Sequence, residues 1–405
     1  MPPRVPEGES CRAIIGARVM EKAMSARAEY TPPLFTITCR ACGRTVPPQP
    51  WTWEHSCGSP LDLSMDVGRE RVLSCRIGAA NGLRRFAPVL PLAVLPDTAI
   101  GDTPMLTEDI EGVHVTFKLE YLNPGGSFKD RGAYAAVARC VELGFDSIVV
   151  DSSGNAGIAM ARMGLRLGIG VDVFLPDWTP DGKKRLLRLL GARLHECKGD
   201  RMAVHTAAVE FSGKGAAYVG HWWNPYFIHG VKTMAYEVVE QMPTVDYVVA
   251  PVGAGTVLLG LHTGFSEIAA AGLLPRMPRL VAAQAAGFAP VCVELGAGQP
   301  GGETSRLADG IAIADPPRRQ QIVAAVRDTQ GFGVVVDDAE ISHALGWLVA
   351  RGYIVEPTSA VALAATFEAI HRGRIPKGSS VLVPLTGTGM KVLEELTGVV
   401  SGEPG

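Results

Sequence analysis

The stretch Ser147-Ile-Val-Val-Asp-Ser-Ser-Gly-Asn-Ala-Gly157 decides the fold class of this chain. A short β-branched run is followed by a turn of small residues, and the apolar residues after the turn recur at helical spacing. Such a junction of strand, turn and helix is typical of parallel α/β sheets. The junction recurs along the sequence, with strands predicted at 147–151, 171–175, 216–219, 247–251, 280–284 and 381–385.

Segments with apolar residues three and four positions apart lie between these strands. They predict helices at 131–143, 156–167, 182–190, 202–212, 232–241, 256–268, 318–328, 339–350 and 358–371. The predicted fold class is α/β, with two doubly wound open-sheet domains and a small N-terminal knuckle-like extension. Because ligands of such sheets lie beyond the carboxyl ends of the strands, the loops from strand to helix are where chemistry is expected.

The composition excludes several classes of partner. Of the 405 residues 47% are hydrophobic and 20% are charged, and the net charge of −3 does not attract nucleic acid or an anionic membrane. No apolar run approaches the ~20 residues that span a bilayer, and residues 1–21 contain no signal-like apolar block. Scattered cysteines favour free thiols. We therefore expect a cytoplasmic protein that binds a small molecule.

The N-terminal part of the chain differs from the rest. Residues 1–35 lack any periodicity and predict a disordered arm. Residues 36–95 predict a turn-rich extension that holds a Cys-rich knuckle and a connector. The remaining length exceeds what one hydrophobic core usually serves, so two domains are expected to follow.

Two loops carry residues suited to a carbonyl or a carboxylate. Asn123-Pro-Gly-Gly-Ser-Phe-Lys-Asp-Arg-Gly132 places Lys129 at a helix start, where the dipole favours a neutral, nucleophilic amine. The alternative is a surface lysine that pairs with Asp130. The turn 151–157 exposes amides at a helix N-terminus, which suits a carboxylate unless its serines or Asn155 only cap the helix.

Two further loops end in glycine turns. Pro251-Val-Gly-Ala-Gly-Thr256 is of the type that cradles a phosphate, although it lacks the lysine of a nucleotide P-loop. Val383-Pro-Leu-Thr-Gly-Thr-Gly389 follows the last predicted strand. Thr386 in this loop could offer its hydroxyl to a ring nitrogen, or could cap a helix.

Taken in chain order, the four loops resemble the cofactor loops of fold-type-II pyridoxal-phosphate-dependent enzymes, the tryptophan synthase beta-like superfamily, and above all its threonine synthase branch. The resemblance covers roughly residues 101–396. It implies a cofactor in the cleft between a large pyridoxal-phosphate-binding domain, 96–130 and 231–400, and a small domain, 131–230. It also implies a homodimer that acts on a small amino-acid substrate.

The resemblance assigns roles to individual residues. Lys129 would be the catalytic residue that holds the cofactor as a Schiff base, Asn155 would contact the phenolic oxygen of the cofactor, and Thr386 would face its pyridine nitrogen. The cofactor phosphate would be held by Gly253, Ala254, Gly255 and Thr256. The substrate would be bound by Ser127, Ser152, Ser153, Asn155, Ala156, Asn224 and Glu356.

The neutral Thr386 restricts the expected reaction. A hydroxyl does not readily protonate the pyridine nitrogen, which discourages the long-lived carbanions of transamination and leaves elimination and replacement accessible. We therefore expect a carbon–oxygen lyase, and the resemblance implies conversion of O-phosphohomoserine to threonine and phosphate. The alternatives are a serine or threonine dehydratase, a β-replacement synthase making cysteine or cysteate, a non-catalytic ligand-binding protein, and a zinc-ribbon nucleic-acid binder.

One segment departs from the threonine synthase pattern. Phe227 and Val231 stand where an arginine and a glutamine for the substrate phosphate are expected. A run of cations at 183–185 could supply the charge instead, or could form a solvated helix face. Trp222 and Trp223 could shape a less polar pocket, or could serve packing alone.

The extension resembles the small zinc knuckle that precedes some relatives. Cys39-x-x-Cys42 is followed after fourteen residues by Cys57-Gly58. A closed zinc site needs four ligands, and the expected place of the fourth is occupied by Glu54, while His55 would require altered spacing. The candidate ligands Cys39, Cys42 and Cys57 therefore predict a metal-free knuckle in which zinc is unlikely.

Overall fold

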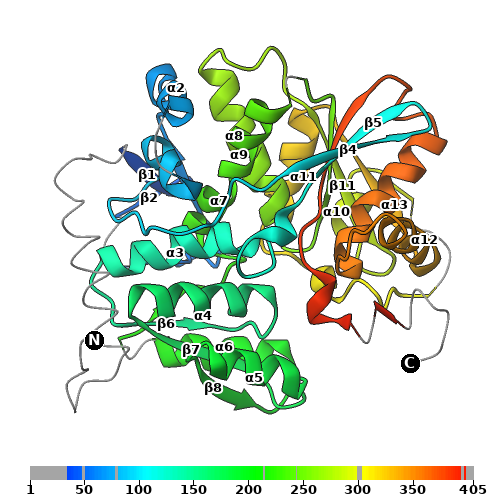
Figure 1. Ribbon diagram of the computed structural model, residues 1–405. Coiled ribbons are helices and arrows are strands. Elements are labelled where there is room, and N and C mark those ends of the chain that lie inside the picture. Colours follow the sequence, from blue (N-terminus) through cyan, green and yellow to red (C-terminus); the bar gives the residue numbers. More distant parts are fainter. Residues whose placement is uncertain are drawn as a thin grey trace, which may run out of the picture. The chain divides into compact units, whose positions relative to one another are not determined.

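The computed structural model describes residues 34–47, 51–77, 81–212, 215–242, 244–298, 303–393 and 396–397 (Figure 1). Two compact units make up the chain. The first comprises the described parts of Met1–Val67, Ile77–Thr98 and Lys129–Gly230. The second comprises the described parts of Gly68–Arg76, Ala99–Phe128 and Val231–Gly405. Residues 1–33 of the predicted arm lie outside the described residues.

The first unit contains two sheets. A small antiparallel sheet has the order β2-β1-β3, with β1 at Phe35–Cys39, β2 at Thr45–Val46 and β3 at Leu61–Met65. A parallel sheet has the order β8-β7-β6-β9. Its strands are β6 (Ser147–Val150), β7 (Gly170–Pro176), β8 (Arg193–Cys197) and β9 (Ala217–Tyr218).

Helices α4 (Asn155–Leu167), α5 (Asp181–Leu189) and α6 (Arg201–Ser212) pack on the parallel sheet of the first unit. The unit also contains α3 (Lys129–Glu142), the short α7 (Pro225–Val231) and the 3₁₀ helix η2 (Gly82–Val89). Helices α3 and α4 lie side by side (Figure 1). Small residues allow this close packing, since most of α3 is buried and rich in alanine.

The second unit is built on one sheet with the order β12-β11-β10-β13-β5-β4. Neighbouring strands are parallel except that β4 pairs antiparallel with β5 at the edge. The strands are β4 (Met105–Ile110), β5 (Val113–Lys118), β10 (Tyr247–Pro251), β11 (Arg279–Ala285), β12 (Phe332–Val336) and β13 (Ser380–Pro384).

Seven α-helices of the described residues belong with this sheet, and buried Val, Ala and Leu side chains of β5, β11, β12, α12 and α13 form the main core. The helices are α2 (Arg69–Ile77), α8 (Thr233–Gln241), α9 (Thr256–Ala270), α10 (Pro290–Glu294), α11 (Arg319–Asp328), α12 (Asp338–Val349) and α13 (Pro357–His371). Three 3₁₀ helices lie at Glu120–Leu122 (η3), Asp309–Ile311 (η4) and Gly389–Lys391 (η5).

The α/β class and all fifteen predicted strands and helices are confirmed, with ends that shift by one or two residues. Strands β4, β5, β8 and β12, the three short strands of the extension and the short helices were not predicted from the sequence. Within the described ranges, no helix is long and apolar enough to cross a bilayer.

Candidate active site

The predicted cofactor loops of the second unit flank a switch point in its sheet. From β10 the chain proceeds outward to β11 and β12, and then returns through α12 and α13 to β13 on the other side of β10. Parallel neighbours end at the same edge, so the loops at 253–256 and 386–389 lie at one edge of the sheet. Open α/β sheets bind their ligands at such a point.

The loop at 253–256 has the geometry of an anion cradle. Gly255 is the N-cap of α9 and has φ +78°, a conformation that favours glycine, and it has no side chain with which to cap the helix. An added Cβ would meet Ile311 Cα at 2.9 Å from Gly253, and Ile322 Cδ1 at 2.2 Å from Gly255. The backbone N–H groups of this buried loop are therefore available at a helix N-terminus, which fits the phosphate of pyridoxal phosphate.

Thr386 lies in a network of neutral groups. Its hydroxyl is 2.9 Å from the Ser359 hydroxyl, which also accepts from the N–H of Gly387 at 3.0 Å. The Glu356 side chain lies against the same loop, since a Cβ added to Gly387 would meet its carboxyl carbon at 2.4 Å. Thr388, not Thr386, caps the turn η5 that follows. The structure thus brings the predicted residues Thr386 and Glu356 together.

Ser127, from the loop that precedes Lys129, lies beside Thr386 and Gly387. It pairs with Gly387 in an isolated bridge, and the N–H of Phe128 donates to the Thr386 carbonyl at 3.0 Å. The Ser127 hydroxyl is fully buried, and among the residues that the structure describes it has no hydrogen-bond partner. A buried polar atom of this kind is costly unless a bound group satisfies it, which again fits a cofactor or substrate.

The predicted carboxylate loop occupies the switch point of the first unit's sheet. The chain proceeds from β6 to β7 and β8, and then returns to β9 on the other side of β6. The turn after β6 contains Ser152 and Ser153 and leads to Asn155, the first residue of α4. Gly154 is the N-cap of α4, so neither the serines nor Asn155 occupies the capping position that the alternative gave them. Ala156 is buried in the first turn.

Lys129 is the first residue of α3, as predicted. Its Nζ lies 5.9 Å from the ring centroid of Phe227. Asp130 forms an ion pair with Arg162 at 3.0 Å, so its place beside Lys129 reflects packing of α3 against α4 and not a turn at the surface. Phe227 is fully buried and forms an apolar wall beside the amine.

His221 and Asn224 lie near Phe227, in the chain segment that precedes α7. Burial and the nearby cations of Lys129 and Arg201 keep the pKa of His221 well below its usual range, so its imidazole is neutral. The Asn224 carbonyl oxygen accepts from the N–H groups of Tyr226 (2.9 Å) and Phe227 (3.3 Å) at the start of α7. Its buried Nδ2 has no hydrogen-bond partner among the described residues.

A polar cluster behind the carboxylate loop escaped the sequence analysis. Asp151 accepts a hydrogen bond from Tyr218 at 2.9 Å and lies 2.9 Å from His205 Nδ1. The ring of Trp53 packs edge-on against Tyr218 with centroids 4.7 Å apart. The four residues lie far apart in sequence, directly after β6, on α6, on β9 and in the extension, so no single motif could have revealed the cluster.

Comparison with known proteins agrees with this geometry. Residues 97–387, well over half of the chain, match the family described as "Pyridoxal-phosphate dependent enzyme". The chain belongs to this family. It is 31% identical to the threonine synthase of Synechocystis sp. over 78% of this chain and 83% of the relative, and 33% identical to that of Mycobacterium leprae over 72% and 82%.

A solved structure in the same family extends the comparison. The processed form of threonine deaminase isoform 2 from Solanum lycopersicum shares 25% identity with a TM-score of 0.64, over 74% of this chain and 83% of that one. These findings confirm the threonine synthase-like resemblance and a pyridoxal-phosphate-dependent lyase. They leave the role of each individual residue as a prediction.

The cations at 183–185, which could replace the missing arginine or form a solvated helix face, differ in their surroundings. Lys184 is buried in α5, where its Nζ contacts Glu196 and the Asp177 carbonyl at 2.7 Å each. Its charge is therefore used within the helix packing. Lys183 is partly exposed and Arg185 is exposed on the same helix.

Proposed function

We propose that this enzyme catalyses carbon–oxygen elimination and replacement of the threonine synthase type, converting O-phosphohomoserine to threonine and phosphate. The observation that carries the reaction class is the neutral hydroxyl pair of Thr386 and Ser359 at the switch point of the second unit. A partner without charge would not keep a pyridine nitrogen protonated. The similarity to threonine synthases supports the choice of substrate.

Different residues of the chain would bind the cofactor and transfer the proton. Lys129 would hold the cofactor covalently through Nζ, residues 253–256 would bind its phosphate, and Asn155 would contact its phenolic oxygen. When bound, pyridoxal phosphate withdraws electrons from the α carbon of an attached amino acid. The Lys129 amine would then move a proton at that α carbon, and the buried Phe227 ring beside it would exclude water.

The substrate carboxylate would be bound by the N-terminus of α4, where Ser152, Ser153, Asn155 and Ala156 lie. The N-cap of this 13-residue helix is Gly154, which has no side chain, and the first N–H groups and the helix dipole favour an anion. Ser127, Asn224 and Glu356 would complete the contacts to the substrate. The unpartnered polar atoms of Ser127 and Asn224 support this assignment.

A second function is favoured by Phe227. Its ring stands beside Lys129 where a phosphate-binding arginine is expected, and the nearby imidazole of His221 is neutral. An apolar, uncharged wall suits a substrate without phosphate, such as serine or threonine. The alternative is therefore a serine or threonine dehydratase or a β-replacement synthase, and the similarity to a threonine deaminase supports it.

One set of assays separates these functions. The enzyme is purified with pyridoxal phosphate, and release of phosphate and threonine from O-phosphohomoserine is measured beside release of ammonia from serine and threonine. We expect the wild-type enzyme to release phosphate from O-phosphohomoserine. Lys129→Ala should lose the absorbance of the bound cofactor, and its activity should fall by at least about 10³-fold. The exposed Lys198→Ala is the matched control and should retain both.

Each outcome has a definite reading. Ammonia release with no attack on O-phosphohomoserine would replace the first proposal by the second. Full cofactor binding and turnover in Lys129→Ala would overturn both. The domain limits, the homodimer and the cytoplasmic location expected from the sequence stay predictions.

A further inference from the structure

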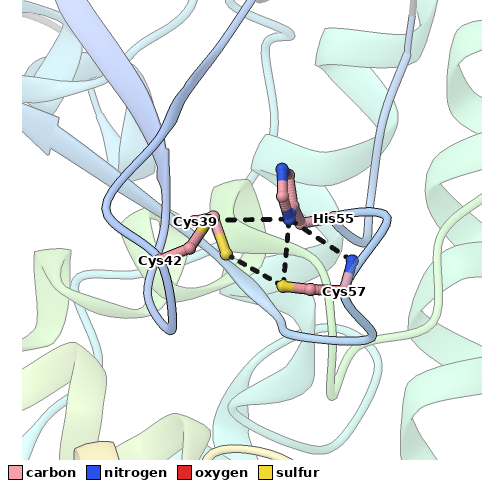
Figure 2. A group of neighbouring side chains, drawn as sticks. All are labelled: Cys39, Cys42, His55 and Cys57. Atoms are coloured by element: carbon pink, nitrogen blue, oxygen red, sulfur yellow. Dashed lines mark hydrogen bonds between the residues drawn. The ribbon is translucent and has the colours of Figure 1, made fainter.

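Four metal-ligating side chains meet at the small sheet of the first unit: Cys39, Cys42, His55 and Cys57 (Figure 2). Their ligand atoms all lie within 4.8 Å of one another. Cys57 Sγ lies 3.5 Å from Cys39 Sγ and 3.0 Å from His55 Nδ1, which lies 3.8 Å from Cys42 Sγ. Tetrahedral zinc with Zn–S of about 2.3 Å separates two sulfurs by about 3.8 Å. The cluster therefore has the dimensions of one coordination sphere.

Two tight turns hold these ligands in place before any metal binds. Cys39 ends β1, and the N–H of Gly43 donates to its carbonyl at 2.8 Å. In the second turn the N–H of Gly58 donates to the His55 carbonyl at 2.9 Å. Gly43 has φ +68° and Gly58 has φ +75°, conformations that favour glycine. Both turns are thus specified by the backbone and the sequence.

The second turn explains why His55 replaces the ligand expected at position 54. Glu54 pairs with Pro60 in an antiparallel bridge, and the His55 N–H donates to the Ser59 carbonyl at 3.0 Å. Adjacent residues of an extended strand point to opposite sides, so Glu54 and His55 diverge. Since Nδ1 is close to the backbone, a His-x-Cys turn presents both ligands where the sequence analysis expected a Cys-x-x-Cys turn.

We propose that Cys39, Cys42, His55 and Cys57 bind one Zn²⁺ through three thiolates and the Nδ1 atom of His55. Thiolate and imidazole ligands in a tetrahedral set select zinc, and four protein ligands leave no open position for catalysis. The site is therefore structural. The cysteines are free thiols, and the 3.5 Å between Cys39 and Cys57 sulfurs exceeds the ~2.05 Å of a disulfide bond.

The metal would fix a hairpin that supports the carboxylate loop. Residues 51–60 carry Trp51, whose Nε1 donates to the Tyr218 carbonyl at 2.9 Å, and Trp53, whose ring packs on the Tyr218 ring. Tyr218 in turn donates to Asp151, the first residue after β6. Zinc bound at this hairpin would thus stabilise the contacts of Trp51 and Trp53 with Tyr218, and through Tyr218 the position of Asp151.

The test measures zinc in the full-length chain. The protein is expressed in zinc-supplemented medium, dialysed, and analysed by inductively coupled plasma mass spectrometry. We expect about one zinc ion per chain, falling below about 0.2 in His55→Ala and in Cys57→Ser. Matched controls are Cys197→Ser and the exposed His114→Ala, which should keep the metal. Glu54→Gln should also keep it, because that carboxylate is not a ligand.

A second measurement does not depend on the folding of variants. The metal-free wild-type chain is titrated with Co²⁺, and we expect the intense visible absorption of a tetrahedral thiolate complex, displaced by added Zn²⁺. The proposal is overturned by a wild-type chain without zinc, by zinc that persists in both His55→Ala and Cys57→Ser, or by a weak octahedral cobalt spectrum. A disulfide between Cys39 and Cys57 in the freshly purified, reduced chain would overturn it as well.

Discussion

Gly132 is the residue on which the placement of the Phe227 ring depends. A Cβ at this position would lie 2.3 Å from two ring atoms of Phe227, and that ring is fully buried beside Lys129. We expect Gly132→Ala to lower the free energy of unfolding by about 1–3 kcal/mol, since overpacking forces the ring or α3 to move. Turnover should fall with it, because the Lys129 amine shifts with the helix start.

Chemical denaturation of Gly132→Ala checks this expectation, with Gly182→Ala as the matched control. Gly182 lies in α5, is exposed, and would place its Cβ in open space. The control should be neutral or stabilising by up to about 1 kcal/mol. Equal stability of the Gly132 variant and the wild type would show that the ring is not fixed by this contact.

His205 contributes a pH-dependent part of the stability. The hydrogen bond to Asp151 raises its pKa above the usual value although burial opposes the shift, and Glu54 adds to the rise. A raised pKa in the folded state means that the stabilisation is complete below an unfolded pKa of about 6.5, and is lost as pH rises through the folded pKa. His205→Gln should therefore destabilise the chain more at pH 6 than at pH 8.5.

Thermal unfolding at the two pH values measures this difference. The same substitution at the exposed His114 is the control and should change stability by no more than a few tenths of a kcal/mol at either pH. A His205→Gln effect of equal size at both pH values would mean that the imidazolium form makes no contribution.

Among the elements, β5 and α8 are joined by a buried ion pair. Lys118 Nζ lies 2.7 Å from Glu237 Oε2, and both side chains are 0% exposed. Glu237 also accepts from the Asp102 N–H at 2.9 Å, and Lys118 donates to the Thr103 carbonyl. Glu237→Gln replaces the carboxylate that lies 2.7 Å from this buried ammonium by a neutral amide, so it should lower the free energy of unfolding by about 3–5 kcal/mol.

The double variant Lys118→Met/Glu237→Leu isolates the charge effect. Replacement of a whole buried pair by apolar side chains is often neutral, so the double variant should be more stable than Glu237→Gln in urea. A double variant less stable than the single one would show that the hydrogen bonds to Asp102 and Thr103 outweigh the desolvation of the charges.

Whether a strand could be predicted from the sequence depended mainly on how deeply the strand is buried. Central strands such as β6 and β10 are buried, β-branched runs, and they were predicted within one residue. The edge strands β4 and β8 are largely exposed and contain charged residues, so they offer no apolar run and were missed. The buried run of β12 did carry a signal, and the sequence analysis overlooked it.

The glycine loops were found for a different reason. Each has glycines directly after a predicted strand, as at 253–256 and 386–389, and it was the order of four such loops that carried the resemblance to the family. The fourth member of the cysteine cluster is placed by a turn whose shape the spacing does not reveal. The spacing therefore pointed to Glu54, whereas His55 is the residue that lies with the three thiols. Asp151, His205 and Tyr218 come from three elements, and their meeting could not be inferred from a single sequence.

For the whole molecule, each unit places a loop that is predicted to bind an anion at the switch point of its own sheet. The predicted phosphate cradle belongs to the second unit and is closed by Ile311 and Ile322, which leave no space for a side chain at Gly253 or Gly255. The family fixes the cofactor, so its binding energy should depend on this cradle as well as on Lys129.

Ligand-linked stability tests this dependence. Pyridoxal phosphate at 100 times its dissociation constant should raise the free energy of unfolding by about 2.7 kcal/mol, whereas the same concentration of pyridoxal, which lacks the phosphate, should raise it far less. Gly255→Ala should abolish the difference between the two ligands, since φ +78° and the Ile322 contact exclude a side chain there. Gly346→Ala, with open space at its Cβ, should preserve the difference. Equal stabilisation by both ligands in differential scanning calorimetry would place the phosphate elsewhere, and the loop at 253–256 would then be a structural turn.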